Sequence, residues 1–156
     1  MYVFDTNSFS KLFGCYPIDS FPSLWRRFDS LSSSGGILST REVLIELEAG
    51  KRRTENAYNW AKENRELFTP LIGDEAAAVA DIFRVEHFQQ IMRRKEGVVN
   101  TSADPFIIAR ASFRGGTVVT EESKPPHGAR IPNICERFNI PCVKLNGFMQ
   151  RENWTF

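Results

Sequence analysis

The segment Asp104-Pro-Phe-Ile-Ile-Ala-Arg-Ala-Ser-Phe113, together with Gly115-Gly116 and Thr117-Val-Val-Thr120 behind it, decides the expected fold. Proline suits the first position of a helix, so Asp104-Pro105 predicts a helix start. The residues that follow are apolar almost all round the helix, which predicts a central rather than a surface position. The two glycines end this helix, and Thr117–Thr120 is expected to form the next strand.

Short strands and helices alternate over the rest of the chain as well. The expected strands are Tyr2–Phe4, Ile37-Leu38, Thr117–Thr120 and Cys142–Leu145. The expected helices are Ser8–Phe13, Phe21–Leu31, one opened by a capping box at Ser39-Thr-Arg-Glu42, Thr54–Phe68, Asp74–Lys95, Asp104–Phe113, Pro132–Phe138 and a terminal helix from about Asn146. This alternation predicts an α/β fold, in which a parallel sheet is covered on both faces by helices.

Length, composition and charge narrow the class of protein. The 156 residues suit one domain, and 42% apolar with 25% charged residues exclude a disordered or fibrous chain. No apolar run approaches the roughly 18 residues of a membrane span, and the N-terminus lacks an export signal, so a cytoplasmic location is expected. The net charge of +1 excludes a generally basic nucleic-acid coat. The three cysteines form no C-x-x-C, which argues against a zinc ribbon or a disulfide framework.

Acidic residues stand where the expected strands end and where helices begin. Asp5 follows the first strand, Glu46 lies about two turns into the next helix, Asp104 opens the buried helix, and Glu121 and Glu122 follow the strand behind it. Parallel strands end at one edge of a sheet, so these carboxylates are expected to converge there. Clustered carboxylates raise one another's pKa, and a divalent cation relieves the repulsion. Oxygen ligands alone suit Mg²⁺ or Mn²⁺.

Each acid taken singly also has a plainer interpretation. Asp104 could be only the N-cap of its helix, since aspartate is a preferred cap. Glu46 could be a solvated helix residue, and Glu121 and Glu122 could be ordinary loop acids. Asp5 is harder to explain in this way, because a carboxylate behind an apolar strand needs partners. The joint pattern therefore favours a metal site.

Four short motifs with these acids occur in a fixed order along the chain. They read Phe4-Asp5-Thr6-Asn7, Val43-x-x-Glu46-Leu47, Ala103-Asp104-x-x-Ile107-x-Ala109 and Val119-Thr120-Glu121-Glu122. In this order they resemble the acidic motifs of PIN domains, and Ile140-Pro-Cys-Val143 resembles the closing strand of that family. The resemblance covers most of the chain and is greatest to a divergent VapC-like branch of unassigned function.

The resemblance implies both a fold and an activity. The fold would be a PIN-like three-layer α/β/α sandwich with a central parallel sheet, in a single nuclease domain over residues 1–156. The activity would be that of a Mg²⁺- or Mn²⁺-dependent endoribonuclease, the toxin of a toxin–antitoxin pair, which leaves a 5′-phosphate and a 3′-hydroxyl. The implied partners are an RNA substrate, a protein antitoxin and a second copy of the chain in a homodimer.

The resemblance also implies roles for particular residues. The catalytic set would be Asp5, Glu46, Asp104 and Glu122, the metal ligands Asp5, Asp104 and Glu122, and the supporting residues Thr6, Asn7 and Thr120. Thr6 and Asn7 would orient Asp5. Glu122 departs from the family pattern, in which Asp or Asn is usual at this place. Whether Glu121 or Glu122 faces the site therefore stays open, as does the choice between one and two metal ions.

Basic clusters and two further functions complete the expectations. Arg41, one turn from Glu46, and the group Lys51, Arg52 and Arg53 are the candidates for RNA contact, although such clusters are more often solvated helix ends. One alternative is a phosphatase with Asp5 as nucleophile, but the second aspartate of such sites is replaced by Asn7. The other alternative is a PIN-like module that binds RNA or protein without cleaving RNA.

Overall fold

The computed structural model describes residues 1–89 and 102–156, without the side chain of Arg53, and a parallel sheet lies at its centre. The strands are β1 (Tyr2–Phe4), β2 (Ile37–Thr40), β3 (Phe68–Thr69), β4 (Thr117–Val119) and β5 (Cys142–Val143). Neighbouring strands pair in parallel in the order β3-β2-β1-β4-β5. The chain therefore winds outward from β1 in both directions. In such sheets ligands bind beyond the carboxyl ends of the strands, where the winding reverses.

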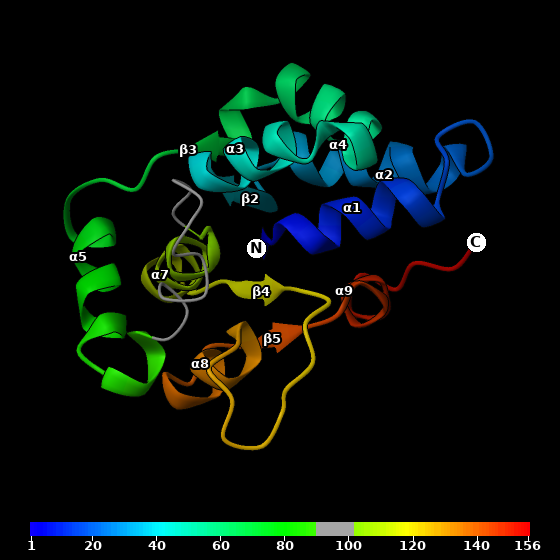
Figure 1. The fold of residues 1–156 in the computed structure, drawn as a ribbon. Coiled ribbons are helices and arrows are strands. Elements are labelled where there is room, and N and C mark those ends of the chain that lie inside the picture. Colours follow the sequence, from blue (N-terminus) through cyan, green and yellow to red (C-terminus); the bar gives the residue numbers. More distant parts are fainter. Residues whose placement is uncertain (90–101) are drawn as a thin grey trace.

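Helices cover both faces of this sheet, so the chain has the predicted α/β fold with three layers (Figure 1). One face carries α5 (Gly73–Phe83), α7 (Asp104–Arg114) and α8 (Ile131–Arg137). The other face carries α1 (Thr6–Cys15), α2 (Pro22–Ser33), α4 (Lys51–Glu63) and α9 (Leu145–Arg151). The elements α3 (Arg41–Ala49), η1 (Arg65–Leu67) and η2 (Glu86–Gln89) connect them. Within residues 1–89 and 102–156 no helix is long and apolar enough to cross a membrane.

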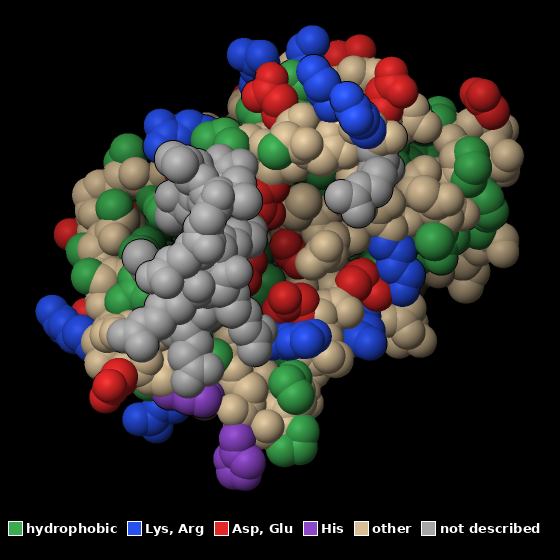
Figure 2. Space-filling view, viewed as in Figure 1, with side chains coloured by type: hydrophobic (Ala, Val, Ile, Leu, Met, Phe, Trp, Pro, Cys, Tyr) green, Lys and Arg blue, Asp and Glu red, His purple; other side chains and the backbone are tan. Residues whose placement is uncertain are grey.

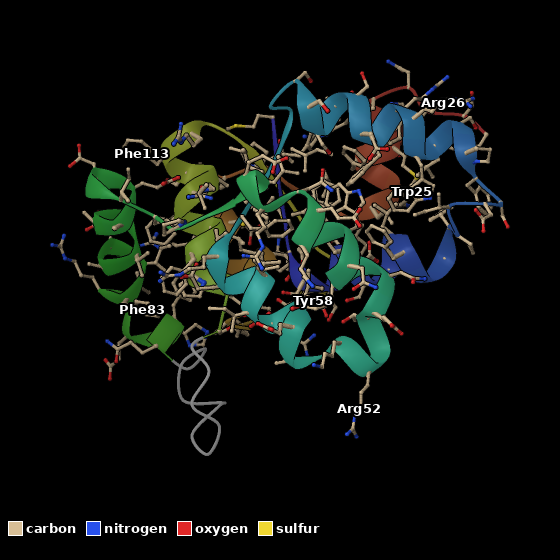
Figure 3. The ribbon with its side chains drawn as sticks, turned by 90° about the horizontal axis from the view of Figure 1, so that it is seen from above. Trp25, Arg26, Arg52, Tyr58, Phe83 and Phe113 are labelled. Carbon is tan, nitrogen blue, oxygen red and sulfur yellow. The ribbon has the colours of Figure 1, made fainter. Side chains whose placement is uncertain are left out.

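Phe4 is the centre of an aromatic core between the sheet and α1, α2 and α9. Its ring centroid lies 5.3 Å from that of Phe9, 5.7 Å from that of Phe28 and 5.1 Å from that of Phe148. Tilted and edge-on ring pairs of this kind contribute beyond the area they bury. α2 has one face toward the core and one toward solvent, since Trp25 points inward and Arg26 points outward (Figure 3). This core holds the end of β1, and therefore Asp5, in a fixed place.

α7 is the central helix that the sequence predicts, but it carries a buried charge. Arg110 is 2% exposed, and its Nε donates to Glu75 Oε1 on α5 at 2.9 Å. Its guanidinium also donates to the carbonyl oxygens of Ser39, Thr69 and Pro70. These carbonyls lie at the ends of β2 and β3. One side chain thus connects α7 to α5 and to the edge of the sheet.

Two of the predicted helices are shorter than the apolar pattern indicates. In place of the predicted helix Thr54–Phe68, α4 ends at Glu63 and is followed by η1 and β3. Phe68 belongs to β3, whose two residues are too few to show the alternation of a strand. In place of the predicted helix Asp74–Lys95, the chain forms α5 and η2, and residues 90–95 lie outside the described part.

The predicted capping box at Ser39–Glu42 is wrong, because Ser39 belongs to β2. Its hydroxyl donates to Phe4 O on the neighbouring strand at 2.8 Å and is not available to a helix end. The N-cap of α3 is Thr40 instead. The terminal helix α9 begins one residue before Asn146.

Candidate active site

The ends of four strands place four side chains in one row across the sheet. The strand register continues past the paired residues to set Thr40, Asp5, Thr120 and Lys144 side by side, at the ends of β2, β1, β4 and β5. Asp5 N donates to the Val119 carbonyl at 3.0 Å, which carries the β1–β4 pairing beyond Phe4. Neighbouring strands lie about 4.8 Å apart. Asp5, which is 1% exposed, is therefore flanked by a threonine on each side.

The carboxylate of Asp5 is the point on which the predicted acids converge. Its Oδ2 accepts a hydrogen bond of 2.7 Å from Thr120 Oγ1. The pKa of Asp5 is raised to about 7, chiefly by burial and then by the charge of Asp104. Glu122 and Glu46 contribute smaller rises, and the hydrogen bond from Thr120 acts against them. The other three predicted catalytic acids are therefore all close enough to act on the charge of Asp5.

Glu46 holds together the starts of two helices. Its Oε2 accepts a hydrogen bond of 2.6 Å from Thr6 Oγ1 on α1, and its Oε1 accepts one of 3.0 Å from Ala103 N just before α7. Asp104 is the first residue of α7, whose N-cap is Ala103, so the plainer interpretation of Asp104 as an N-cap does not hold. The contacts of Glu46 position Asp104 beside Asp5 rather than leave Glu46 in solvent.

Glu122 and Glu121 have separate roles at the ends of two other helices. Glu122 Oε2 accepts from Ile131 N at the start of α8 at 2.9 Å, and Glu121 Oε1 accepts from Leu145 N at the start of α9 at 2.8 Å. Glu122 belongs to the charges that raise the pKa of Asp5. Glu121 instead lies 2.6 Å from the Lys11 ammonium. Glu122 is therefore the acid that faces Asp5.

The pKa of Glu121 reflects the same arrangement. Burial alone would raise this pKa, but the hydrogen bonds from Lys11 and from Leu145 N, with the charges of Lys11 and Lys144, outweigh burial and lower it. Glu121 is thus held as a carboxylate by its partners and serves the attachment of α9.

The predicted supporting residues are only partly confirmed in their contacts. Thr120 donates to Asp5, as the prediction requires. Thr6 donates to Glu46 instead of Asp5, because it opens α1 on the side where α3 packs. Asn7 is exposed, and within residues 1–89 and 102–156 it makes no hydrogen bond to Asp5. That Thr6 and Asn7 orient Asp5 therefore stays a prediction, which no hydrogen bond from either side chain to the Asp5 carboxylate supports in the described residues.

Two buried polar atoms at the end of β2 and the start of α3 have no hydrogen-bond partner in the described structure. They are Thr40 Oγ1, in a residue that is 0% exposed, and Glu42 Oε2, in a residue that is 8% exposed. Buried polar groups are nearly always paired, so such atoms point to a missing water, ion or ligand. Thr40 is the neighbour of Asp5 in the row of strand ends. Sequence reasoning missed it, because only the pairing of β2 with β1 places it there.

Asp5, Asp104 and Glu122 are the residues whose carboxylate oxygens could hold a hydrated divalent cation. Carboxylate oxygens are the ligands that Mg²⁺ and Mn²⁺ prefer, and a cation beside Asp5, Asp104 and Glu122 would offset the repulsion among them. In the described part of the chain no three His, Cys, Asp or Glu residues stand close enough to hold an ion by themselves. Mg²⁺ commonly keeps several waters and takes only one or two carboxylates, which this arrangement permits.

The predicted basic residues Arg41, Lys51 and Arg52 are exposed on α3 and at the start of α4. Figure 2 shows acidic side chains gathered in a hollow near the start of α1, with lysine and arginine side chains around it. Arg41 is exposed and lies 3.5 Å from Glu42 Oε1, and Lys51 and Arg52 are exposed in the first turn of α4. Arg52 points away from the body of the molecule (Figure 3). The side chain of Arg53 lies outside the described residues.

One known family matches almost the whole chain. The profile of a domain of unknown function, DUF4411, matches residues 2–156. The chain belongs to the DUF4411 family. Among curated proteins, none matches the chain. The description of the family assigns no activity, so the function rests on the residues at the strand ends, and the resemblance to PIN domains remains a hypothesis.

Proposed function

We propose that this member of the DUF4411 family is a metal-dependent endoribonuclease of the PIN type. The observation that carries the proposal is the convergence of Glu46, Asp104 and Glu122 on the buried carboxylate of Asp5. The cluster stands beyond the carboxyl ends of a parallel sheet, at the point where its winding reverses. Clustered carboxylates repel one another when no cation is bound, and a divalent cation between them would offset that repulsion.

The proposed roles follow from the contacts of each residue. A bound Mg²⁺ or Mn²⁺ would activate water and stabilise charge on a phosphodiester. Asp5 and Asp104 would hold the cation, and Glu122 would contribute the oxygen that does not bond to α8. Thr120 fixes the Asp5 carboxylate through its hydroxyl, and Glu46 keeps Asp104 in position by its bond to Ala103 N.

Cleavage of RNA by the purified protein tests this proposal. Labelled cellular RNA is incubated with Mg²⁺, Mn²⁺ or EDTA, and the wild type is compared with Asp5→Asn and with Glu121→Gln as the matched control. Metal-dependent cuts with 5′-phosphate ends are expected from the wild type and the control, and none from Asp5→Asn. Cleavage by Asp5→Asn, or cleavage that survives EDTA, would refute the proposed mechanism.

A binding module without cleavage activity is the second candidate. It is favoured by the hydrogen bonds that occupy both oxygens of Glu46, and by the lack of an enclosing three-residue metal site in the described part of the chain. This candidate predicts RNA or protein binding that is the same in Mn²⁺ and in EDTA. Calorimetry that detects no Mn²⁺ binding, together with intact RNA, would favour it over the nuclease.

The biological setting forms part of the proposal. We infer that the protein acts on RNA in the cytoplasm as the toxin of a toxin–antitoxin pair, that a protein antitoxin holds it inactive, and that it forms a homodimer. Light scattering of the purified chain gives its mass in solution, and co-purification from its own cell shows whether a small partner accompanies it. A monomer without a partner would remove these parts of the proposal and leave the nuclease standing.

A further inference from the structure

A second hollow opens directly beside the acidic site. It has a volume of about 290 Å³, and Thr120 and Glu122 form the wall that it shares with the acids. Cys142, on the next strand, also lines this hollow. Its thiol is close enough to Asp5 and Glu122 for their charges to act on its pKa. A chain bound at Asp5 would therefore continue into this hollow. We propose that the hollow holds the nucleotide next to the scissile phosphate of a single-stranded RNA, an inference that rests on the proposed nuclease function.

The floor of the hollow suits the face of a base. It is formed by Pro132, Cys142 and Val143, all of them half-buried and therefore still accessible from outside. Pockets for organic ligands combine an apolar lining with a few polar groups that fix orientation. A flat base can stack on such an apolar floor, whereas a hydrated inorganic ion gains nothing from it. The Ser123 hydroxyl at the edge accepts from Arg130 Nη1 at 2.9 Å and keeps its own O–H to donate to the polar rim of the base.

The rim of the hollow suits the phosphates on either side of that base. It carries Lys124 and Lys144, both exposed. Lys144 stands two strands from Asp5 in the row of strand ends, so the two backbones are roughly 10 Å apart, and a lysine stem spans much of that distance. Lys124 pairs with the exposed Glu136, and a surface pair of this kind is readily exchanged for a phosphate.

The thiol of Cys142 provides a probe inside the hollow. Asp5→Asn protein is treated with iodoacetamide in the presence and absence of a ten-nucleotide single-stranded RNA, and alkylation is followed by mass spectrometry. Cys15, whose side chain is exposed away from this hollow, serves as the internal control. We expect RNA to slow the alkylation of Cys142 several-fold and to leave that of Cys15 unchanged.

Lysine variants supply a second measurement that does not depend on the thiol. In the Asp5→Asn background, Lys124→Ala/Lys144→Ala is compared with Lys62→Ala, an exposed lysine on α4, by the anisotropy of labelled RNA at several salt concentrations. Loss of two phosphate contacts should lower the slope of log affinity against log salt by about 1.4, since each contact on a single strand contributes about 0.7. The Lys62 variant should retain the slope of its parent.

The outcomes separate this inference from the proposed nuclease. RNA that protects Cys142 and loses affinity in the double lysine variant supports the nucleotide site, whether or not cleavage is seen. Metal-dependent cleavage by the wild type, with Cys142 alkylated at the unprotected rate, overturns the nucleotide site and leaves the nuclease. Protection of Cys142 without cleavage in any metal supports the nucleotide site and overturns the nuclease.

Discussion

Asp5 bears a charge that its surroundings disfavour. Its pKa of about 7 lies above the ordinary value of about 3.9, chiefly because of burial and then because of Asp104. A carboxyl whose pKa is raised on folding favours the folded state while it is protonated and loses that contribution as it ionises. The free energy of unfolding should therefore fall between about pH 4 and about pH 7. The difference between the two pKa values corresponds to roughly 4 kcal/mol.

The variant Asp5→Asn isolates this effect. Asparagine can still accept from Thr120 Oγ1 but does not ionise, so the variant should lack the loss of stability that the wild type shows between about pH 4 and about pH 7. Urea unfolding in EDTA, followed by tryptophan fluorescence, measures both proteins across this range. Near pH 7.5 the variant should be the more stable by a few kcal/mol, and near pH 4 the two should agree. Parallel curves would show that ionised Asp5 costs nothing.

Addition of Mn²⁺ should reverse the order of stability of the wild type and Asp5→Asn. A cation that binds only the folded state stabilises it in proportion to the logarithm of its concentration over its dissociation constant. At pH 7.5 the wild type should gain stability with rising Mn²⁺, and Asp5→Asn should gain little. An equal gain in both proteins would place the cation elsewhere.

Glu46 offers a test of position against charge. In Glu46→Gln the amide oxygen can accept from Ala103 N, and the amide nitrogen can donate to Thr6 Oγ1, so the change in stability should stay below about 1 kcal/mol. Glu46→Ala leaves Ala103 N without its acceptor and should cost about 1–3 kcal/mol. Cleavage should fall in both variants. Glu48→Gln, on the same helix but bonded to Tyr58, is the control that should keep activity.

At the scale of elements, Glu121 and Glu122 attach two helices to the end of β4. Glu121→Ala and Glu122→Ala each remove an acceptor for the start of a helix, so each should cost about 1 kcal/mol. Only Glu122→Ala should also abolish cleavage, because only Glu122 faces Asp5. Thermal unfolding and the RNA assay, performed on the same preparations, separate the two effects. Loss of cleavage in Glu121→Ala at full stability would reverse the assignment.

Acid should weaken the attachment of α9 in particular. The pKa of Glu121 is lowered in the folded state, so its contribution is present above the ordinary value and is lost as the pH falls through the lowered one. The stability difference between wild type and Glu121→Ala should therefore shrink in acid. A difference that stays constant down to pH 2 would mean that the carboxylate charge is not involved.

The elements that the sequence predicts well are those whose signal is local. An apolar run, a glycine pair and a short apolar strand within one stretch predict α7 and β4, and Asp5 could be placed because it directly follows β1. The sequence did not predict β3, because its two residues are too few to show the alternation of a strand. Its pairing with β2 is a long-range contact, which a local pattern does not reveal. Ser39 and Glu42 match the local pattern of a capping box, but the Ser39 hydroxyl donates to Phe4 O on the neighbouring strand instead.

The parts of the site that the sequence does not predict depend on strand order. Thr40 and Lys144 lie next to Asp5 and Thr120 only because the order is β2-β1-β4-β5. That Glu122 rather than Glu121 faces Asp5 depends on where α8 and α9 begin in space. Spacing along the chain identifies acids that can meet, whereas the packing of the helices decides which of them do.

At the scale of the whole molecule, Arg110 connects the helices and strands that hold the site in place. It connects α7, which begins at Asp104, with α5 through Glu75, and with the ends of β2 and β3 through three carbonyl oxygens. Glu75 is 2% exposed as well, so the ion pair is fully buried. A buried pair of this kind adds little over an apolar replacement, but the removal of one partner leaves an uncompensated charge. The carbonyl bonds make this case different from a simple pair.

A double-mutant cycle on Arg110 and Glu75 measures that difference. Arg110→Met should cost about 3 kcal/mol, because Glu75 then stays buried with only its longer contact of 3.6 Å to the half-exposed Arg114. If the ion pair were the whole contribution, the double variant Arg110→Met/Glu75→Met would regain nearly the wild-type stability. The carbonyls of Ser39, Thr69 and Pro70 lose their donor in both variants, so the double variant should remain about 1–3 kcal/mol less stable than the wild type. Urea unfolding of the four proteins decides between the two, and full recovery would show that water replaces the guanidinium at those carbonyls.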